Sequence, residues 1–216
     1  MSTVNLHERD REQLTEQLVA SFTSFPETFR RLIVPALREL AGGQPVQPER
    51  LATHAGLPLE QTIALLRESG GEWDPSGKLL VGLGLTSVPT PHRFEVGGHT
   101  LWTWCAVDSL LFPVAIGAPA RLSSPDATTG DPVRIDLTPT GVQRVEPAGA
   151  VVSIVTSRVD LAQIRPAICG NQNFYRSPAT AAPWLAAHPD GHLLPVADTF
   201  EVYRRVALRV WPELGD

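Results

Sequence analysis

The segment SVPTPH, residues 87–92, divides the sequence into two stretches with different hydrophobic patterns. Before it, apolar residues recur every three or four positions, which is the spacing of amphipathic helices. After it, short runs rich in Val, Ile and Leu alternate with turn-forming Gly, Pro and Asp, which is typical of β-strands. The sequence therefore predicts a helical region over residues 1–86 and a second region of the α+β class over residues 87–216.

The first region contains signals for several helices followed by a hairpin. Leu14, Leu18 and Phe22 define one helical face within residues 8–41, and a second helix follows before the break at AGGQP. VQPERLATHAGLPLEQTIALLRES then predicts a short helix, a tight turn and another helix, and WDPSGKLLVGLGLT predicts a hairpin around its DPSG turn. This order resembles a winged-helix unit.

The second region predicts an antiparallel-sheet core flanked by helices. Helices are expected in CAVDSLLFPVAIG and in SPATAAPWLAAHP. Strands are expected in RFEVGG, ARLSSP, PVRIDLTPTGVQRVEP and AVVSIVTS, the last three as an antiparallel meander. Both cysteines of the chain fall in this region.

Charge and composition disfavour several classes of function. The net charge is −5, and Arg67 is the only base in the second helix of the helix-turn-helix, so we expect no nucleic-acid partner and disfavour a metal-responsive DNA regulator. The longest apolar run contains Pro113, Gly117 and Pro119, and the N-terminus is polar, so we expect no membrane segment. Two cysteines do not make a disulfide framework, and we expect a cytoplasmic protein with free thiols.

Cys105 and Asp108 stand at the expected start of a helix, three positions apart, so they should share one helix face. A helix N-terminus lowers the pKa of a thiol whereas burial raises it, so the net shift is open at this point. The structural alternative is that Cys105 is a small core residue and Asp108 a first-turn acid favoured by the helix dipole.

Cys169 follows an apolar triplet and precedes Gly170, which predicts a strand end or loop, where side chains often meet substrates. Neither cysteine belongs to a CxxC pair, so a zinc ribbon and a thioredoxin-type motif are absent. The histidines form no HExxH set, and we expect His188 and His192 to lie at the surface around a turn.

The remaining chemistry is that of two thiols and one carboxyl group. Two thiolates favour a soft metal, and a nearby acid can move a proton. Cleavage of a carbon–metal bond calls for this set, because thiolate binding pushes electron density onto carbon and the acid then protonates it.

With this set of residues, the chain resembles the organomercurial (alkylmercury) lyases of bacterial mercury resistance. The resemblance rests on WCAVDSLLFPVAIG, on ARLSSPDATTGDPV followed by VEPAGAVVSIV, and on IRPAICGNQNFYRSPATAAPWLAAHP. The blocks occur in the family's order through residues 94–190, and the N-terminal helices and hairpin also fit.

The resemblance implies that Cys105, Asp108 and Cys169 form the catalytic set and the ligands of the mercury product, with Trp104 shaping the substrate pocket. It implies protonolytic cleavage of an organomercurial to a hydrocarbon and Hg(II), with no cofactor for bond cleavage. Low-molecular-weight thiols would be needed for turnover, and Hg(II) could pass to a mercuric reductase.

Two positions depart from the family pattern. Asp126 stands where some relatives carry a structural cysteine, and Gly170 stands where some carry a second thiol. Neither belongs to the implied catalytic set, so we expect the activity to be kept and local stability to differ. The alternative function is a non-catalytic carrier or sensor that binds Hg(II) or Cu(I) through the same cysteine pair.

Overall fold

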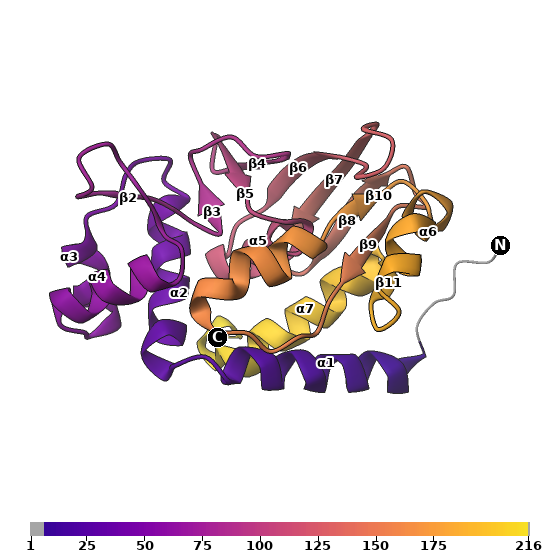
Figure 1. Ribbon diagram of the computed structural model, residues 1–216. Coiled ribbons are helices and arrows are strands. Elements are labelled where there is room, and N and C mark those ends of the chain that lie inside the picture. The colour runs from indigo at the N-terminus through magenta and orange to yellow at the C-terminus, as the bar shows by residue number, and fades with distance from the viewer. Residues whose placement is uncertain (1–6, 216) are drawn as a thin grey trace.

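The computed structural model describes residues 7–215 and has the predicted α+β architecture (Figure 1). An antiparallel sheet is flanked by helices from both ends of the chain. The two helices expected within residues 8–41, the helix-turn-helix and the hairpin are all present. Their bounds are α1 (Glu8–Thr23), α2 (Glu27–Leu40), α3 (Pro48–Ala55), α4 (Leu59–Glu68), β1 (Glu72–Trp73) and β2 (Leu80–Leu83).

The main sheet joins the predicted hairpin to the strands that follow SVPTPH. Its strand order is β1-β2-β3-β5-β4-β6-β7-β8, and every pairing is antiparallel. The remaining strands of this sheet are β3 (Leu85–Thr86), β4 (His92–Val96), β5 (His99–Thr103), β6 (Ala120–Pro125), β7 (Pro132–Thr138) and β8 (Gly141–Glu146). Because β3 pairs with β5, the sheet continues across residue 86, where we place the boundary between the two regions.

The prediction for AVVSIVTS is wrong in one respect. Its strand, β9 (Val151–Ile154), does not extend the meander of β6, β7 and β8 but forms the centre of a second, three-stranded sheet. All four residues of β9 are buried, which is the pattern of a strand covered on both faces. Its two neighbours are β10 (Phe174–Tyr175) and β11 (His192–Pro195).

Within residues 7–215, three further α-helices complete the fold. The expected helices are α5 (Ala106–Ile116) and α6 (Pro178–Ala187). The third, α7 (Val196–Val210), is absent from the sequence prediction. Helix α5 is buried on almost every side and contacts α2, α7 and both sheets, which explains why its sequence is apolar throughout. Gly117 ends α5 in the left-handed conformation that favours glycine.

Helix α1 packs along α7 (Figure 1). Only Leu14, Thr15 and Leu18 of α1 are buried, and ion pairs join its exposed side to α7, including Arg209 with Glu12 at 2.8 Å. Within residues 7–215, none of the helices is both long enough and apolar enough to cross a membrane.

Candidate active site

Cys105 is the N-cap residue of α5, and this places its sulfur beside the free N–H groups of the first helical turn. The Asp108 backbone N–H donates to Cys105 Sγ at 3.4 Å. The predicted face-sharing of Cys105 and Asp108 is therefore present, and it arises from helix capping. A strand, β5, leads directly into the cap, so the sheet fixes where the helix begins.

Cys169 reaches the same place from a segment of short, irregular helical turns, which differs from the predicted strand end or loop. One π-helical turn covers Ile164–Ile168, and a 3₁₀ turn covers Cys169–Asn171. Single π turns inside helical segments occur frequently at functional sites. The Asn171 side chain donates to the carbonyl of Ala167 at 2.9 Å, which holds the turn around Cys169 closed.

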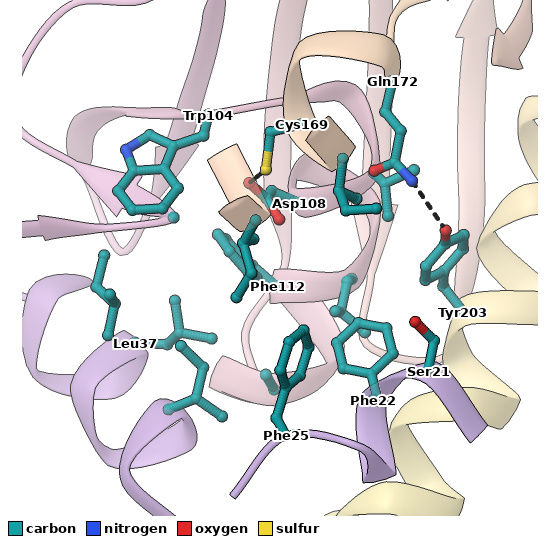
Figure 2. Close-up of a pocket in the computed structure, with 18 of the residues that line it drawn as sticks. Ser21, Phe22, Phe25, Leu37, Trp104, Asp108, Phe112, Cys169, Gln172 and Tyr203 are labelled. Carbon is teal, nitrogen blue, oxygen red and sulfur yellow. Dashed lines mark hydrogen bonds between the residues drawn. The ribbon is translucent and has the colours of Figure 1, made fainter. Parts of the chain in front are cut away.

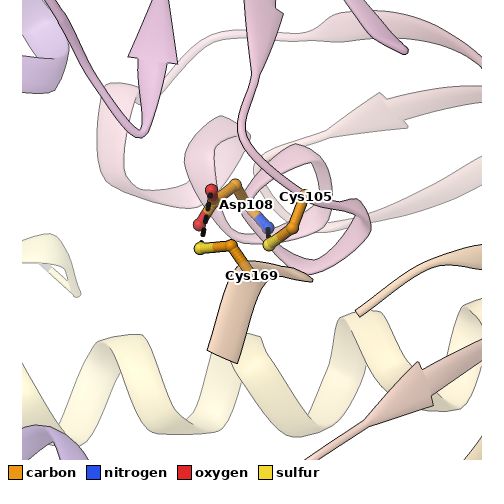
Figure 3. A group of neighbouring side chains, drawn as sticks. All are labelled: Cys105, Asp108 and Cys169. Carbon is orange, nitrogen blue, oxygen red and sulfur yellow. Dashed lines mark hydrogen bonds between the residues drawn. The ribbon is translucent and has the colours of Figure 1, made fainter. Parts of the chain in front are cut away.

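The two sulfurs and the Asp108 carboxylate converge on one point (Figure 3). Their ligating atoms all lie within 4.8 Å of one another, and Cys169 Sγ lies 3.9 Å from Asp108 Oδ2. Both cysteines are buried and free. Among residues 7–215, this is the only group of three such side chains close enough to hold one metal ion. A soft ion could bind both sulfurs together.

Burial dominates the electrostatics of the three groups. It raises the pKa of the Asp108 carboxyl to about 7 and raises the pKa of the Cys105 thiol well above its ordinary value. Hydrogen bonding to Cys105 lowers the pKa of Cys169, but burial and the Asp108 charge outweigh this and leave that pKa raised. At neutral pH both thiols therefore keep their protons until a metal displaces them, and Asp108 lies near its titration midpoint.

An apolar cavity of about 120 Å³ opens beside these groups (Figure 2). Trp104 lies on its wall, and its part in shaping a substrate pocket stays a prediction. Figure 2 shows three phenylalanine rings, those of Phe22, Phe25 and Phe112, beneath Asp108 and Cys169. They come from α1, from the turn after it and from α5.

Trp104 is held from two sides. Its backbone N–H donates to the carbonyl of Gly84 at 2.9 Å, and the Arg165 guanidinium lies 4.7 Å from its ring centroid. Arg165 also pairs with Glu72 of β1 at 2.7 Å. The segment that carries Cys169 is thus tied to the hairpin of the first region through the pocket wall.

Comparison with known proteins decides the family. Residues 85–207 match the family model MerB, described as alkylmercury lyase. Alkylmercury lyase of Staphylococcus epidermidis is 45% identical over 179 residues, which cover 82% of each chain. That of Pseudomonas putida is 38% identical over 201 residues, which cover 92% of this chain and 94% of the relative. The chain belongs to the alkylmercury lyase family.

A solved structure supports the fold. The mercury-bound form of MerB2 has a TM-score of 0.70 to this chain, with 21% identity, and covers 94% of this chain and 100% of its own. The predicted family and the predicted activity, cleavage of carbon–mercury bonds, are confirmed by the relatives. Nothing in these comparisons favours the alternative of a non-catalytic carrier or sensor.

Sequence reasoning missed two polar residues beside the sulfur of Cys105 in this lyase. Gln172 and Tyr203 are both buried, and the Gln172 amide lies between Cys105 Sγ at 3.5 Å and the Tyr203 hydroxyl at 3.3 Å. Gln172 stands three positions after Cys169, and its place in a polar run after a buried thiol was a usable signal. Tyr203 belongs to α7, which was not predicted.

Asp126 is a buried carboxylate with three backbone donors. The N–H groups of Thr128, Thr129 and Arg176 donate to it at 2.7, 2.9 and 2.7 Å. Burial raises the pKa of Asp126, but these bonds outweigh burial and hold the pKa below its ordinary value. The residue predicted to affect local stability therefore ties the turn after β6 to the start of α6.

His188 and His192 are both half-buried, and the prediction of a surface position is wrong for both. The His188 ring stacks on Trp184 with centroids 4.4 Å apart, and its Nε2 lies 3.1 Å from Asn171 Oδ1. Asn171 belongs to the turn that carries Cys169, so α6 supports this turn from behind.

Proposed function

We propose that Cys105, Asp108 and Cys169 carry out the protonolysis in this lyase, with Trp104 and the apolar cavity receiving the organic group. The convergence of two buried sulfurs and one carboxylate within 4.8 Å is the observation that carries the proposal. Two thiolates supply the soft ligands that mercury prefers, and the carboxyl lies where it can pass a proton between sulfur and carbon.

The proposed reaction has two steps: binding of the organomercurial by one thiol, and then protonolysis with the help of the second. One thiol attacks R–Hg–X, forms a sulfur–mercury bond and releases X with the thiol proton. The second thiol gives its proton to Asp108 as its sulfur binds mercury. Asp108 then protonates the carbon, the carbon–mercury bond breaks, and a hydrocarbon leaves while Hg(II) stays between the two sulfurs. The raised pKa of Asp108, about 7, suits a group that must both take up and release a proton.

The cavity supports a small, uncharged organic group as substrate. Its wall is formed mainly by aromatic and aliphatic side chains, and its volume is about 120 Å³. Apolar cavities of about 150 Å³ take up benzene, so a short alkyl or a single aryl group suits this one. Burial here also excludes water from the carbon that must receive the proton.

We infer that external thiols remove the product. Two sulfurs hold Hg(II) tightly, and small thiols can replace them by exchange, either into solution or toward a mercuric reductase. Two free cysteines suit a reducing compartment such as the cytoplasm. We also propose that residues 1–86 form a winged-helix-like unit that acts as scaffold and pocket wall, with residues 87–216 as the catalytic unit.

Substitution of the three groups tests the proposal. Cys105→Ser, Cys169→Ser and Asp108→Ala should each abolish release of methane from methylmercury or benzene from phenylmercury, measured in the headspace with excess thiol. Asp131→Ala, which removes an exposed acid, is the matched control and should keep full turnover. Full turnover by the Cys169 variant would rule out the two-sulfur mechanism. Tight Hg(II) binding by the unsubstituted protein without hydrocarbon release would favour the carrier.

A further inference from the structure

We propose that Gln172, anchored by Tyr203, is a positioning residue that orients the sulfur of Cys105. The inference rests on the role proposed above for Cys105. It concerns a side chain that takes no part in the two steps of the reaction but lies on the wall of the same cavity.

Gln172 contacts the two sulfur-bearing segments at once. Its backbone carbonyl accepts from the N–H of Ala106, at the start of α5, at 3.1 Å. Its backbone N–H donates to the carbonyl of Cys169 at 3.2 Å. One of the orphan N–H groups of α5 is thereby satisfied by the segment that carries the other thiol. Any shift of Gln172 would therefore change the separation of the two sulfurs.

The side chain of Gln172 extends this bridge to the sulfur itself. Cys105 Sγ donates to Gln172 Oε1 at 3.5 Å, while the Asp108 backbone N–H approaches the same sulfur from the helix side at 3.4 Å. Two contacts from different directions restrict the Cys105 side chain to one orientation. Gln172 and Cys105 are 2% and 1% exposed, so bulk water does not compete with the Gln172 amide for Cys105 Sγ.

Tyr203 fixes the other end of the amide (Figure 2). Gln172 Nε2 donates to the Tyr203 hydroxyl at 3.3 Å, and Tyr203 is 1% exposed. A buried amide without partners is costly, so an amide at this place is explained by the contacts that it makes. Because a carboxamide offers both an acceptor and a donor, it can also turn an N–H toward the sulfur once that sulfur has lost its proton and bound mercury.

The experiment uses Gln172→Met, which keeps the length of the side chain and removes both polar contacts, and Tyr203→Phe, which removes only the anchoring hydroxyl. Turnover is normalised to the fraction of protein that binds one Hg(II), so that misfolded protein does not count. We expect Gln172→Met to lower kcat about tenfold and to leave KM within about twofold, because the apolar wall is unchanged. Tyr203→Phe should lower kcat about threefold.

A double-mutant cycle on kcat distinguishes an effect of Tyr203 that passes through Gln172 from a general loss of stability. If Tyr203 acts through Gln172, the double variant should be no slower than Gln172→Met alone. Tyr175→Phe, at the other tyrosine of the chain, which is buried in β10, is the matched control and should leave kcat unchanged.

The outcomes separate this inference from the proposed function. Unchanged kcat in both Gln172→Met and Tyr203→Phe, with Cys105→Ser inactive, would overturn the inference and leave the function standing. Full turnover by Cys105→Ser would overturn the function itself. Independent, multiplicative losses in the double variant would overturn the anchoring role of Tyr203. If Gln172→Met fails to fold, Tyr203→Phe, which loses one oxygen atom, still decides the matter.

Discussion

At the scale of single residues, Asp108 should make the stability of the protein depend on pH. Its folded pKa, about 7, lies above the ordinary value of 3.8, so the folded state binds more protons than the unfolded chain between these values. The free energy of unfolding should therefore be highest below pH 4 as far as this group is concerned, and should fall as the pH rises through about 7.

Asp108→Asn should remove this dependence, because an amide does not titrate. At pH 8 the variant should be more stable than the unsubstituted protein, by up to a few kcal/mol at about 1.4 kcal/mol per pKa unit, although it should be inactive. Urea unfolding of the two proteins at pH 5 and pH 8 measures the pH dependence and the difference in stability. Equal pH dependence in the two proteins would contradict the raised pKa.

Gly84, also at this scale, leaves room for the ring of Phe112. Its φ angle is +77°, and a Cβ atom there would lie 2.7 Å from Phe112 Cζ. Gly84→Ala should therefore destabilise the fold by about 2–3 kcal/mol, through backbone strain and overpacking, and should lower activity by moving a pocket residue.

Gly77→Ala is the matched control for Gly84→Ala. Its φ angle is +68°, and no atom lies within 4 Å of the position a Cβ would take, so it tests backbone strain alone. Thermal unfolding should show a loss of about 1 kcal/mol at Gly77 and a larger loss at Gly84. Equal losses would mean that Phe112 adjusts freely.

At the scale of elements, Asp126 holds the turn after β6 against the start of α6. Asp126→Ala leaves three backbone N–H groups without their charged acceptor and should cost about 3 kcal/mol at neutral pH, measured by urea unfolding. Hydrocarbon release at low temperature should continue, because Asp126 does not line the cavity. Asp131→Ala, in the same turn but exposed, should cost well under 1 kcal/mol.

The pH dependence of Asp126 should be opposite to that of Asp108. Because its folded pKa is lowered, its stabilising contribution is present above the ordinary value of 3.8 and is lost as the pH falls through the lower, folded value. The difference in stability between the unsubstituted protein and Asp126→Ala should therefore shrink in acid.

The elements differ in how far their sequences determine them. The start of α5 was predictable, because a small N-cap, an acid at the third position and an apolar run are local signals. The turn that carries Cys169 was not predictable, because a π turn has no local signature and because His188, outside the turn, holds it through Asn171. Helix α7 was missed although Phe200, Tyr203 and Val210 follow a helical period.

At the scale of the whole molecule, the Glu72–Arg165 pair links the hairpin to the Cys169 segment through the wall formed by Trp104. The Glu72 side chain is 16% exposed and that of Arg165 46%, so the carboxylate is shielded from water more than the guanidinium. Arg165→Glu places two carboxylates together and should raise KM for phenylmercury several-fold, by loosening the pocket wall. Adding Glu72→Arg should recover at least half of the loss.

Steady-state kinetics on Arg165→Glu, on Glu72→Arg and on the double variant measure this coupling. Arg144→Glu is the control, because the Arg144–Glu146 pair, at 2.8 Å, is exposed and lies on β8, away from the cavity. A double variant as impaired as the sum of the single ones would exclude charge pairing as the cause.

The site shows the same division between local and long-range signals. The residues proposed to perform the chemistry could be singled out from the sequence, because the chain has only two cysteines and Asp108 stands three positions after one of them. Residues that hold these groups in place, such as Gln172 and Arg165, could not be. Their partners lie far away in the sequence, and only the folded chain brings an amide or a guanidinium against them.

The ion pair between β1 and the π turn also bears on how such sequences diverge. A change of sign at position 72 leaves position 165 facing a like charge unless it changes as well. Across a set of related chains, these two positions should therefore covary, with an acid at one wherever a base stands at the other, and intermediates that break the pair should be scarce.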